Sequence, residues 1–383
     1  MAVMEKKDKT LNVPHLRFPE FSGAWEKGKI KQVCEIATGN KNTQDKSDDG
    51  LYPFYVRSQT IERIDSWTFD GEAILTAGDG VGVGKVFHYS LGKIGVHQRV
   101  YILSNFKCDS KYLYHYFSSR FYGRVKRMSA KNSVDSVRME MIADMQIYLT
   151  SKEEQCKIGK LLTILDERIE TQKKIIEKYE SLIRGLITYV NKGEVWKCKA
   201  TALRDVLTEV HEKNVENYEV CSVSVSQGVI NQIDYLGRSF AAKEVLHYNV
   251  VHYGDLVYTK SPTGEFPYGI VKRSNLVRPV AVSPLYGVYR PVNDTIGIYL
   301  HLYFKSPVYT KNYLHSLIQK GAKNTINITN QHFLNNKIQI PEPDVLEIFV
   351  HTASEIEKKI QAENRVLTSF EKQKKYLLSK MFI

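Results

Sequence analysis

Two long stretches of this chain place apolar residues at alternating steps of four and three. The positions of the second stretch equal those of the first plus 191 (158–190 and 349–381). This spacing is a heptad seam, the pattern of helices that pair in a coiled coil. A helix over 158–190 would be about 50 Å long at ~1.5 Å per residue, which is too long for one domain to cover. The chain therefore needs a partner helix, and the second stretch can supply it.

One position of the first seam is polar, and it aligns with a polar position of the second, Gln172 with Glu363. A polar seam residue costs stability but fixes the register and the partner of a helix. Gly159 and Gly185 both fall outside the seam. The alternative is two unrelated amphipathic helices, each lying on its own domain. The residues expected to pair are Leu162, Leu165, Ile169, Gln172, Ile176, Tyr179, Ile183, Leu186, Ile356, Ile360, Glu363, Leu367, Phe370 and Leu377.

Weaker similarities recur elsewhere, and they keep the same order in both halves of the chain. Their separation drifts from 171 to 193 residues, so loops would differ while the order of elements holds. Internal repetition of this kind indicates a duplicated structural unit. The matching segments are 25–39 with 196–211, 70–79 with 253–262, 129–136 with 321–328, and 145–149 with 338–342.

The sequence predicts an α+β fold with two similar domains of mixed structure, each followed by a long helix. Short runs of β-type residues, separated by Gly, Pro and Asn-Asp signals, predict strands. They lie at 52–57, 72–76, 84–89, 94–103, 219–225, 256–260, 269–273 and 280–290, and short helices are expected at 111–123 and 299–305. The expected divisions are an N-terminal tail (1–21), a first domain (22–150), its helix (151–193), a second domain (194–343) and its helix (344–383).

The chain is basic, with a formal net charge of +12, divided equally as +6 in residues 1–191 and +6 in residues 192–383. A basic surface attracts polyanions, so nucleic acid or an anionic membrane is the first class of partner to consider. The alternative is a solvated basic surface with no partner. No run of 18 apolar residues is present, the N-terminus lacks the apolar core of a signal peptide, and the five cysteines are scattered. We therefore expect no membrane span, no disulfide framework or zinc site, and a cytoplasmic location.

Basic and amide side chains cluster at several places in the two domains, often beside Tyr or Phe. Lysine and arginine neutralise phosphates, while amides and guanidinium groups can read base edges. Any one of them, taken alone, is more simply a solvated surface charge. The expected DNA contacts are Arg57, Ser58, Gln59, Gln98, Arg99, Arg124, Lys126, Arg127, Lys131, Asn132, Lys260, Lys272, Arg273, Arg290, Lys320, Lys323 and Asn324.

The sequence offers no recognisable catalytic or metal motif. The glycine-rich segment 78–85 fails the phosphate-loop pattern, because Asp79 stands where the first glycine is needed and Val86 follows Lys85 in place of Ser or Thr. A tight turn entering a strand explains these glycines. One alternative to a DNA-reading protein is a stand-alone DNA methyltransferase or nuclease, which would need a cofactor motif that the sequence does not show. Another alternative is a coiled-coil scaffold that binds no DNA.

Four segments resemble the specificity subunit of type I restriction–modification enzymes. They are PEFSGAW (19–25), DGEAILTAGDGVGVGKV (70–86), GDLVYTKSPTGEFPYGIVKRS (254–274) and LLTILDERIETQKKIIEKYESLIRGL (161–186). The resemblance extends from about residue 13 to 383, and it rests on architecture because the family has no invariant catalytic motif. One departure is Pro341, which stands at the junction between the second domain and its helix, where the first half has Tyr148 or Leu149.

This resemblance implies that each domain recognises one half of a split double-stranded DNA target, and that the helices set the gap between the halves. It also implies two methyltransferase subunits docked on the helices, and translocating restriction subunits for cleavage. S-adenosylmethionine, ATP and Mg would then belong to those partners, with no cofactor and no catalytic centre on this chain. Duplex DNA has a local two-fold pseudosymmetry, so the two helices should run antiparallel and give a pseudo-two-fold molecule.

Overall fold

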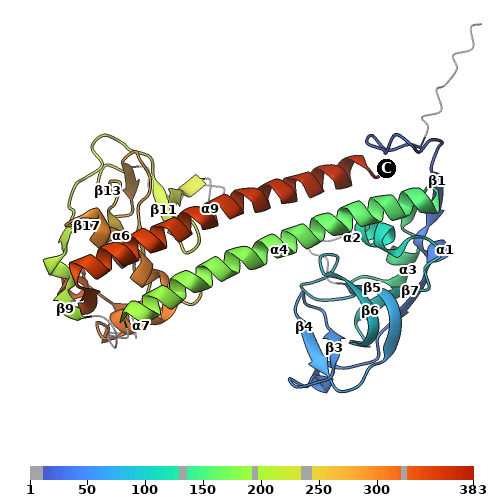
Figure 1. The fold of residues 1–383 in the computed structure, drawn as a ribbon, viewed down its shortest axis with the longest axis horizontal. Coiled ribbons are helices and arrows are strands. Elements are labelled where there is room, and N and C mark those ends of the chain that lie inside the picture. Colours follow the sequence, from blue (N-terminus) through green and yellow to red (C-terminus); the bar gives the residue numbers. More distant parts are fainter. Residues whose placement is uncertain (1–11, 129–135, 192–196, 234–243, 321–325) are drawn as a thin grey trace, which may run out of the picture. The chain divides into compact units, whose positions relative to one another are not determined.

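The computed structural model describes residues 12–128, 136–191, 197–233, 244–320 and 326–383. The chain forms two compact units, the first made of Met1–Lys173 with Arg365–Ile383 and the second of Lys174–Asn364. Two long helices, α4 (Lys152–Asn191) and α9 (Pro343–Lys380), each contribute one part to each unit (Figure 1). Each unit therefore contains a domain built around a sheet and a segment of both long helices.

The first unit is built around a six-stranded sheet. Its strand order is β2-β7-β5-β6-β3-β4, and the β1 and β8 strands pair separately. Neighbouring strands of the large sheet are antiparallel except β3 and β6, which run parallel. The elements are β1 (Glu26–Lys29), α1 (Ile30–Val33), β2 (Glu35–Thr38), η1 (Thr43–Asp45), β3 (Tyr52–Tyr55), β4 (Ile61–Ile64), β5 (Phe69–Ala77), β6 (Phe87–Val96), β7 (Val100–Ser104), α2 (Ser110–Met128), α3 (Met139–Ala143) and β8 (Gln146–Leu149).

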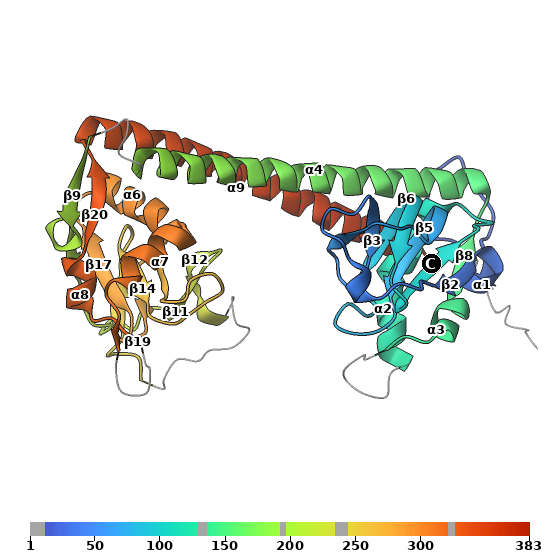
Figure 2. The same ribbon diagram turned by 90° about the horizontal axis from the view of Figure 1, so that it is seen from below.

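The second unit contains an antiparallel four-stranded sheet in the order β10-β17-β14-β15, with the pairs β11–β12, β13–β16, β18–β19 and β9–β20 around it (Figure 2). The elements are β9 (Cys198–Ala202), η2 (Leu203–Asp205), β10 (Leu207–Glu209), β11 (Cys221–Ser224), β12 (Gly228–Asn231), β13 (Asn249–Val251), β14 (Leu256–Thr259), β15 (Ile270–Arg273), β16 (Val280–Val282), β17 (Gly287–Pro291), α6 (Asp294–Lys305), α7 (Pro307–His315), β18 (Gln319–Lys320), β19 (Ile326–Asn327), α8 (Asn330–Asn335) and β20 (Lys337–Pro341).

The two units share one strand order. Across the sheet of the first unit, four neighbouring strands follow the order β2-β7-β5-β6. Across the sheet of the second unit the order is β10-β17-β14-β15, and each strand occupies the equivalent place in the sequence of its half. The small β1–β8 sheet of the first unit corresponds to the β9–β20 sheet of the second, and in both units the later strand leads directly into a long helix. This agrees with the order of elements that the sequence repeats predicted.

A buried tyrosine ties the main helix of each domain to the strand that precedes the long helix. In the first unit the hydroxyl of Tyr112, on α2, donates to the backbone carbonyl of Tyr148 at 2.6 Å. In the second unit the hydroxyl of Tyr299, on α6, donates to the carbonyl of Gln339, also at 2.6 Å. Both tyrosines are almost completely buried. A buried hydroxyl needs such a partner, so these bonds fix each helix against the base of its domain.

The seam positions of both long helices are buried or half-buried along their whole length. In the first unit Lys374 of α9 forms an ion pair with Asp166 of α4, and the Arg168 guanidinium lies 6.0 Å from the centre of the Phe370 ring. In the second unit, by contrast, the two helices meet in an apolar cluster that includes Ile183, Ile187, Ile356 and Ile360. No helix among the described residues is both long enough and apolar enough to cross a membrane.

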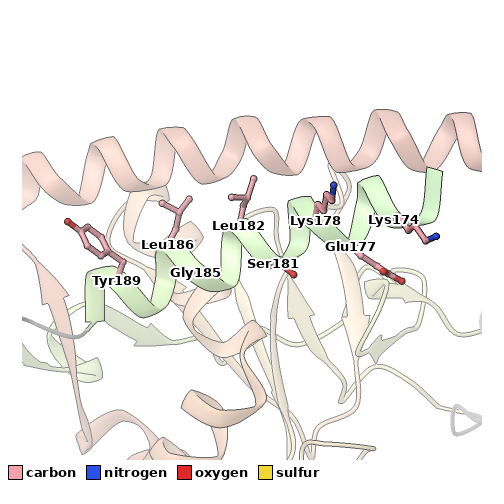
Figure 3. Close-up of a pocket in the computed structure, with 8 residues that line it drawn as sticks. All are labelled: Lys174, Glu177, Lys178, Ser181, Leu182, Gly185, Leu186 and Tyr189. Atoms are coloured by element: carbon pink, nitrogen blue, oxygen red, sulfur yellow. The ribbon is translucent and has the colours of Figure 1, made fainter. Parts of the chain in front are cut away.

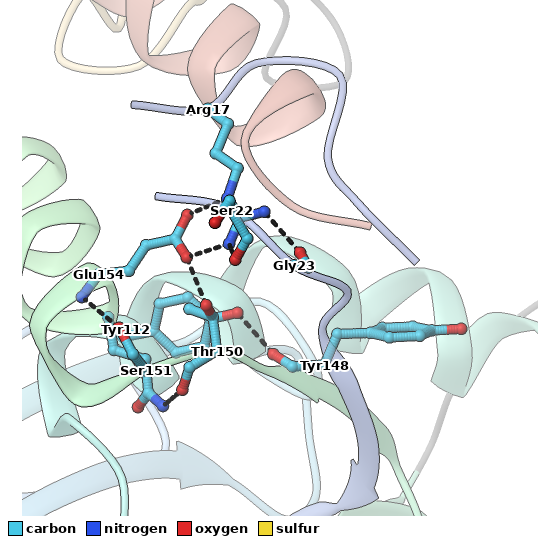
Figure 4. A network of polar contacts seen from close by, with 9 residues as sticks. Arg17, Ser22, Gly23, Tyr112, Tyr148, Thr150, Ser151 and Glu154 are labelled. Atoms are coloured by element: carbon cyan, nitrogen blue, oxygen red, sulfur yellow. Dashed lines mark hydrogen bonds and ion pairs between the residues drawn. The ribbon is translucent and has the colours of Figure 1, made fainter. Parts of the chain in front are cut away.

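The N-terminal segment is fastened to the first unit from residue 12 onward, so the prediction of a tail over 1–21 is wrong for 12–21; residues 1–11 lie outside the described part. The guanidinium of Arg17 donates to both carboxylate oxygens of the fully buried Glu154, each at 2.7 Å, and Thr150 donates to the same carboxylate (Figure 4). The backbone N–H of Leu16 donates to the carbonyl of Lys380 at 2.9 Å. The segment thus contacts the start of α4 and the end of α9.

Three predicted strands have different bounds in the structure because turns interrupt them. The 84–89 strand starts only at Phe87, the 94–103 strand is divided between β6 and β7, and the 280–290 strand between β16 and β17. The predicted turn in the glycine-rich segment is present. Gly80 and Gly84 have φ values of 79° and 67°, and a Cβ on Gly82 would lie 2.3 Å from the Arg57 carbonyl oxygen. Backbone geometry therefore accounts for these glycines.

Candidate nucleic-acid interface

Two exposed arginines of the first unit share one carboxylate. Arg57 follows β3, Asp79 follows β5, and Arg99 lies in the turn between β6 and β7. Arg57 Nη1 lies 2.9 Å from Asp79 Oδ1, and Arg99 Nε lies 3.6 Å from Asp79 Oδ2. The arginine side chains are 45% and 65% exposed. The carboxylate neutralises only one of the two cations, so it orients both guanidinium groups and leaves a net positive charge facing solvent.

The turn that carries Arg99 also presents an amide. Gln98 Nε2 donates to Asn42 Oδ1 at 2.6 Å, which holds an exposed amide pair beside the arginines. The buried His97 supports this turn, because its Nδ1 accepts the backbone N–H of Arg99 at 3.0 Å and its Nε2 lies 3.2 Å from Thr43 Oγ1. Burial and the nearby Arg57 lower the pKa of His97, which favours the neutral ring that these bonds require.

The other predicted contacts of the first unit are dispersed. Ser58 makes a local turn bond to the Thr60 carbonyl, and Gln59 is exposed and lines a separate cavity beside α2, α4 and α9. Arg124 is half-buried and donates to the Met141 carbonyl at 2.9 Å, so it joins α2 to α3. Lys126 and Arg127 are exposed in the last turn of α2. Lys131 and Asn132 lie outside the described residues.

In the second unit Arg290 is held by a buried carboxylate. Its Nε and Nη2 donate to the two oxygens of Asp255 at 3.0 and 3.1 Å, while Asp255 is only 1% exposed. The hydrogen bond to Asp255 raises the pKa of Arg290, whose side chain remains 50% exposed. Such a two-point contact fixes the plane of a guanidinium group. Arg290 is therefore an exposed and oriented cation of the second domain.

Two predicted surface cations of the second unit are buried, so their assignment to an exposed DNA face is wrong. Lys272 is 3% exposed and Arg273 is 5% exposed. Arg273 forms an ion pair with Asp294, donates to Asn275 Oδ1 at 2.6 Å, and lies 4.7 Å from the centre of the Tyr253 ring. These contacts join β15 to α6. Both residues belong to an edge strand that is covered by helices. Two adjacent basic residues do not indicate from the sequence that the strand is buried.

The remaining predicted contacts of the second unit do not converge with Arg290. Lys260 follows the last residue of β14, whereas Asp255 and its partner Arg290 lie at the other end of that strand. Lys260 is half-buried, and burial lowers its pKa. The backbone of Lys320 lies in β18, while Lys323 and Asn324 lie outside the described residues.

Sequence reasoning missed Asp79, Asn42 and His97, which orient the predicted arginines and glutamine of the first unit. Asp79 lies within the segment that was explained by its glycines alone, and the histidine stands directly before Gln98. A further missed pair is Lys85, whose ammonium lies 5.2 Å from the centre of the exposed Tyr122 ring. The sequence did offer one signal for this site, because Asp79 lies in a turn and the basic residues Arg57 and Arg99 lie in turns as well. Among the described residues no group of three or more His, Cys, Asp or Glu side chains could hold a metal ion.

A second candidate surface runs along α4 within the second unit. It borders a shallow cavity of about 820 Å³, lined by Lys174, Glu177, Lys178, Ser181, Leu182, Gly185, Leu186 and Tyr189 (Figure 3). Leu182 and Tyr189 are 54% and 48% exposed. A helix face with exposed apolar side chains beside small residues suits close packing by another protein. We call this strip the α4 face.

Comparison with known proteins shows which family the chain is similar to. The family model of the type I restriction modification DNA specificity domain matches residues 23–181. The chain is 25% identical over 180 residues to the type I restriction enzyme EcoDI specificity subunit of Escherichia coli, a match that covers 45% of this chain and 39% of that protein. The chain thus matches well under half of the length of this relative.

The fold as a whole is similar to a crystal structure of the S subunit of a type I restriction–modification system from M. genitalium. The TM-score is 0.67 at 14% sequence identity, and the likeness covers 97% of this chain and 99% of that one. At that identity the likeness concerns the fold. Residues 23–181 are therefore similar to the type I restriction modification DNA specificity domain, and the chain as a whole shares the fold of that S subunit.

Proposed function

We propose that this chain is the non-catalytic DNA specificity subunit of a type I restriction–modification complex, and that each of its two domains reads one half of a bipartite DNA target. The observation that carries the proposal is the shared strand order of the two central sheets, β2-β7-β5-β6 and β10-β17-β14-β15. Two copies of one reading domain suit a target in two parts. Their loops and charged residues differ, so the two half-sites should differ in sequence.

In the first domain, Arg57 and Arg99 supply the contacts expected of a DNA reader. A guanidinium group can bridge phosphate oxygens or bind guanine in two places, and the amide of Gln98 can bind adenine in the same way. Asp79 and Asn42 hold these groups in position before DNA arrives. In the second domain Arg290 is oriented by Asp255 and would serve as an equivalent cation.

The long helices would set the separation between the two half-sites. We propose that α4 and α9 pair as an antiparallel coiled coil through the seam residues. The ion pair Asp166–Lys374 and the cluster around Ile183 and Ile360 support this pairing within each unit. Two similar halves related by such a pairing would match the local pseudosymmetry of duplex DNA. The spacer between the half-sites would then depend on the number of helical turns.

The partners follow from the same proposal. Two methyltransferase subunits would dock on the helices, and the α4 face with Leu182 and Tyr189 offers an exposed apolar strip for one of them. These subunits would bring S-adenosylmethionine, and restriction subunits would bring ATP and Mg. In this proposal our chain supplies the reading of DNA and no catalytic step.

The proposal is tested by mapping methylated sites in DNA from cells that contain the chain together with its methyltransferase partner. The expected result is one asymmetric bipartite motif with a fixed spacer.

Inserting or deleting four residues between Ile169 and Tyr179 should change the spacer and leave both half-sites as they were. A variant with an unchanged spacer would refute the role of the helices. Absence of salt-dependent binding to duplex DNA would favour a scaffold that binds no DNA.

A further inference from the structure

The second unit contains a cavity that the proposed function does not use. It has a volume of about 800 Å³ and lies among α4, α6, α9, β15 and the β11–β12 hairpin. Every residue that lines it belongs to the second unit. Binding sites for small molecules typically have volumes of ~300–1,000 Å³, so this cavity has the size of such a site.

Lys272 lines this cavity and has no partner for its charge. Its side chain is 3% exposed, and it makes no hydrogen bond or ion pair with any residue that the structure describes. The other lysine of the cavity, Lys305, is paired with Glu357 at 3.1 Å. Burial and the neighbouring Lys272 lower the pKa of His301 to about 3, which leaves that ring neutral. Among the described residues, Lys272 is therefore the buried cation of the cavity that no carboxylate pairs directly, and Glu357, which is paired with Lys305, offsets its charge only in part.

A buried ammonium without a partner is costly, which makes it a strong attractor for an anion. Burial, and then the nearby Lys305, lower the pKa of Lys272 to about 8, so the ammonium form still predominates at neutral pH. The cavity wall combines amides, such as Gln227 and Gln361, with apolar side chains, such as Phe266 and Leu276. The cation and the amides can bind an anionic group, and the apolar side chains can pack against an aromatic ring of the same ligand.

The first unit keeps a cavity at the equivalent place, with a volume of about 900 Å³. Positions separated by 191 line both cavities, as in Asp166 and Glu357 or Ile169 and Ile360. The first cavity also contains a cation without an acidic partner among the described residues, Arg120, whose buried Nε has no hydrogen bond. Its cation comes from α2, whereas the second cavity takes its cation from β15. Both halves thus retain a cavity with a cation that no carboxylate among the described residues pairs directly.

We propose that the second-unit cavity binds a nucleotide-sized phosphate ester, with Lys272 as the ion-pair partner of the phosphate and the apolar wall against the base. Lysine binds phosphate as a point charge, and a doubly charged monoester would also attract Lys305. Phosphodiesters of DNA share this chemistry. A duplex, whose major groove alone is about 12 Å wide, cannot enter a cavity of this volume, so a free nucleotide is the favoured source.

The test is calorimetric titration of the full chain with adenosine 5′-monophosphate, adenosine and inorganic phosphate. We expect saturable binding of the nucleotide, at least tenfold weaker binding of adenosine, and loss of nucleotide affinity by at least tenfold in Lys272→Met. Lys199→Met removes the same charge from an exposed position on β9 and should bind the nucleotide like the unmodified chain. Equal affinity of the Lys272→Met and unmodified chains would overturn the proposal, as would equal affinity for adenosine and the nucleotide.

Two further measurements separate this site from the proposed function. Displacement of the nucleotide by a blunt DNA duplex would assign the phosphate to DNA and overturn a free nucleotide as its source. Lys272→Met should retain the thermal stability of the unmodified chain or exceed it, which shows that any loss of nucleotide binding is not a loss of folding. Its salt-dependent duplex binding should also be unchanged, so failure of one proposal leaves the other intact.

Discussion

Arg57 donates a hydrogen bond to Asp79 at 2.9 Å, although the two residues come from different loops of the first domain. The bond crosses the glycine-rich turn, where Gly82 packs directly against the carbonyl oxygen of Arg57. The turn therefore positions a guanidinium group before any DNA is bound. A group that is already oriented loses less conformational freedom on binding, which favours selective recognition.

Replacing Arg57 should weaken sequence-specific binding more than general binding. We expect Arg57→Ala to cost about 1–3 kcal/mol on a duplex that contains the target, as for loss of one two-point contact to a base. The measurement is fluorescence anisotropy with target and scrambled duplexes at several salt concentrations. Lys199→Ala, on the exposed strand β9, controls for the loss of charge. An equal loss of affinity for the target and scrambled duplexes would show that Arg57 contacts phosphate and does not read a base.

Two glycines of helix α4 should respond in opposite ways to alanine. A Cβ on Gly159 would lie 2.7 Å from Asp109 Oδ1 and 2.9 Å from the Tyr112 backbone nitrogen, so Gly159→Ala should destabilise the chain by about 1–3 kcal/mol. A Cβ on Gly185 would meet no atom within 4 Å, so Gly185→Ala should stabilise it by roughly 0.5–1 kcal/mol. Urea unfolding of the two variants makes a matched comparison. If both variants were destabilised, the higher helix propensity of alanine would not determine the effect of Gly185→Ala on stability.

Removal of Arg17 should leave a buried carboxylate without its cation. Glu154 is fully buried, and the hydrogen bond to it raises the pKa of Arg17. We expect Arg17→Met to destabilise the first unit by about 3–5 kcal/mol, the usual cost of breaking a buried pair from one side. The double variant Arg17→Met with Glu154→Met should recover part of this loss. Hydrogen exchange over residues 12–25 reports the effect locally, and unchanged protection there would contradict the prediction.

Lys272 should give a pH-dependent stability difference with a defined sign. Its pKa is lowered from 10.5 to about 8, by burial and by Lys305 against the opposing effect of Glu357. The folded state therefore binds the proton less tightly than the unfolded state, and this costs stability increasingly as the pH falls from 10.5 through about 8. Lys272→Met removes the cost, so it should stabilise the chain at pH 7 by up to about 3 kcal/mol. The gain should shrink toward zero above pH 10, which denaturation at several pH values would show.

Periodicity predicted the long helices well because a seam depends only on spacing within one helix. Every predicted pairing residue, from Leu162 to Leu377, is buried or half-buried in the structure. The glycine-rich turn was also predictable, since glycine has a specific conformational role there. In contrast, the burial of Lys272 and Arg273 depends on α6, α9 and the β11–β12 hairpin, which come from distant parts of the sequence.

Strand register was harder to predict than strand position. Matching the acidic residues of 70–79 and 253–262 aligns Ile74 with Val257. In the structure Ile74 packs in the cluster that contains the α2 side chains, while Val257 packs with Val288 on the side of its sheet away from α6. A shift of one residue reverses the face of every side chain in a strand. Weak similarity therefore located the equivalent strands but misaligned them by an odd number of residues.

The two ends of the first unit are separated in the sequence by the whole of the second, and this affects how the chain folds during synthesis. Phe382 is 2% exposed and lies 5.2 Å from the Tyr112 ring, between ring centres. On the ribosome, residues 12–173 therefore emerge long before the segment that completes their core, whereas the second unit is one continuous stretch. Until residues 365–383 are translated, the apolar flank of α2 and α4 stays uncovered, and the nascent chain passes through an interval in which chaperone binding or aggregation competes with closure.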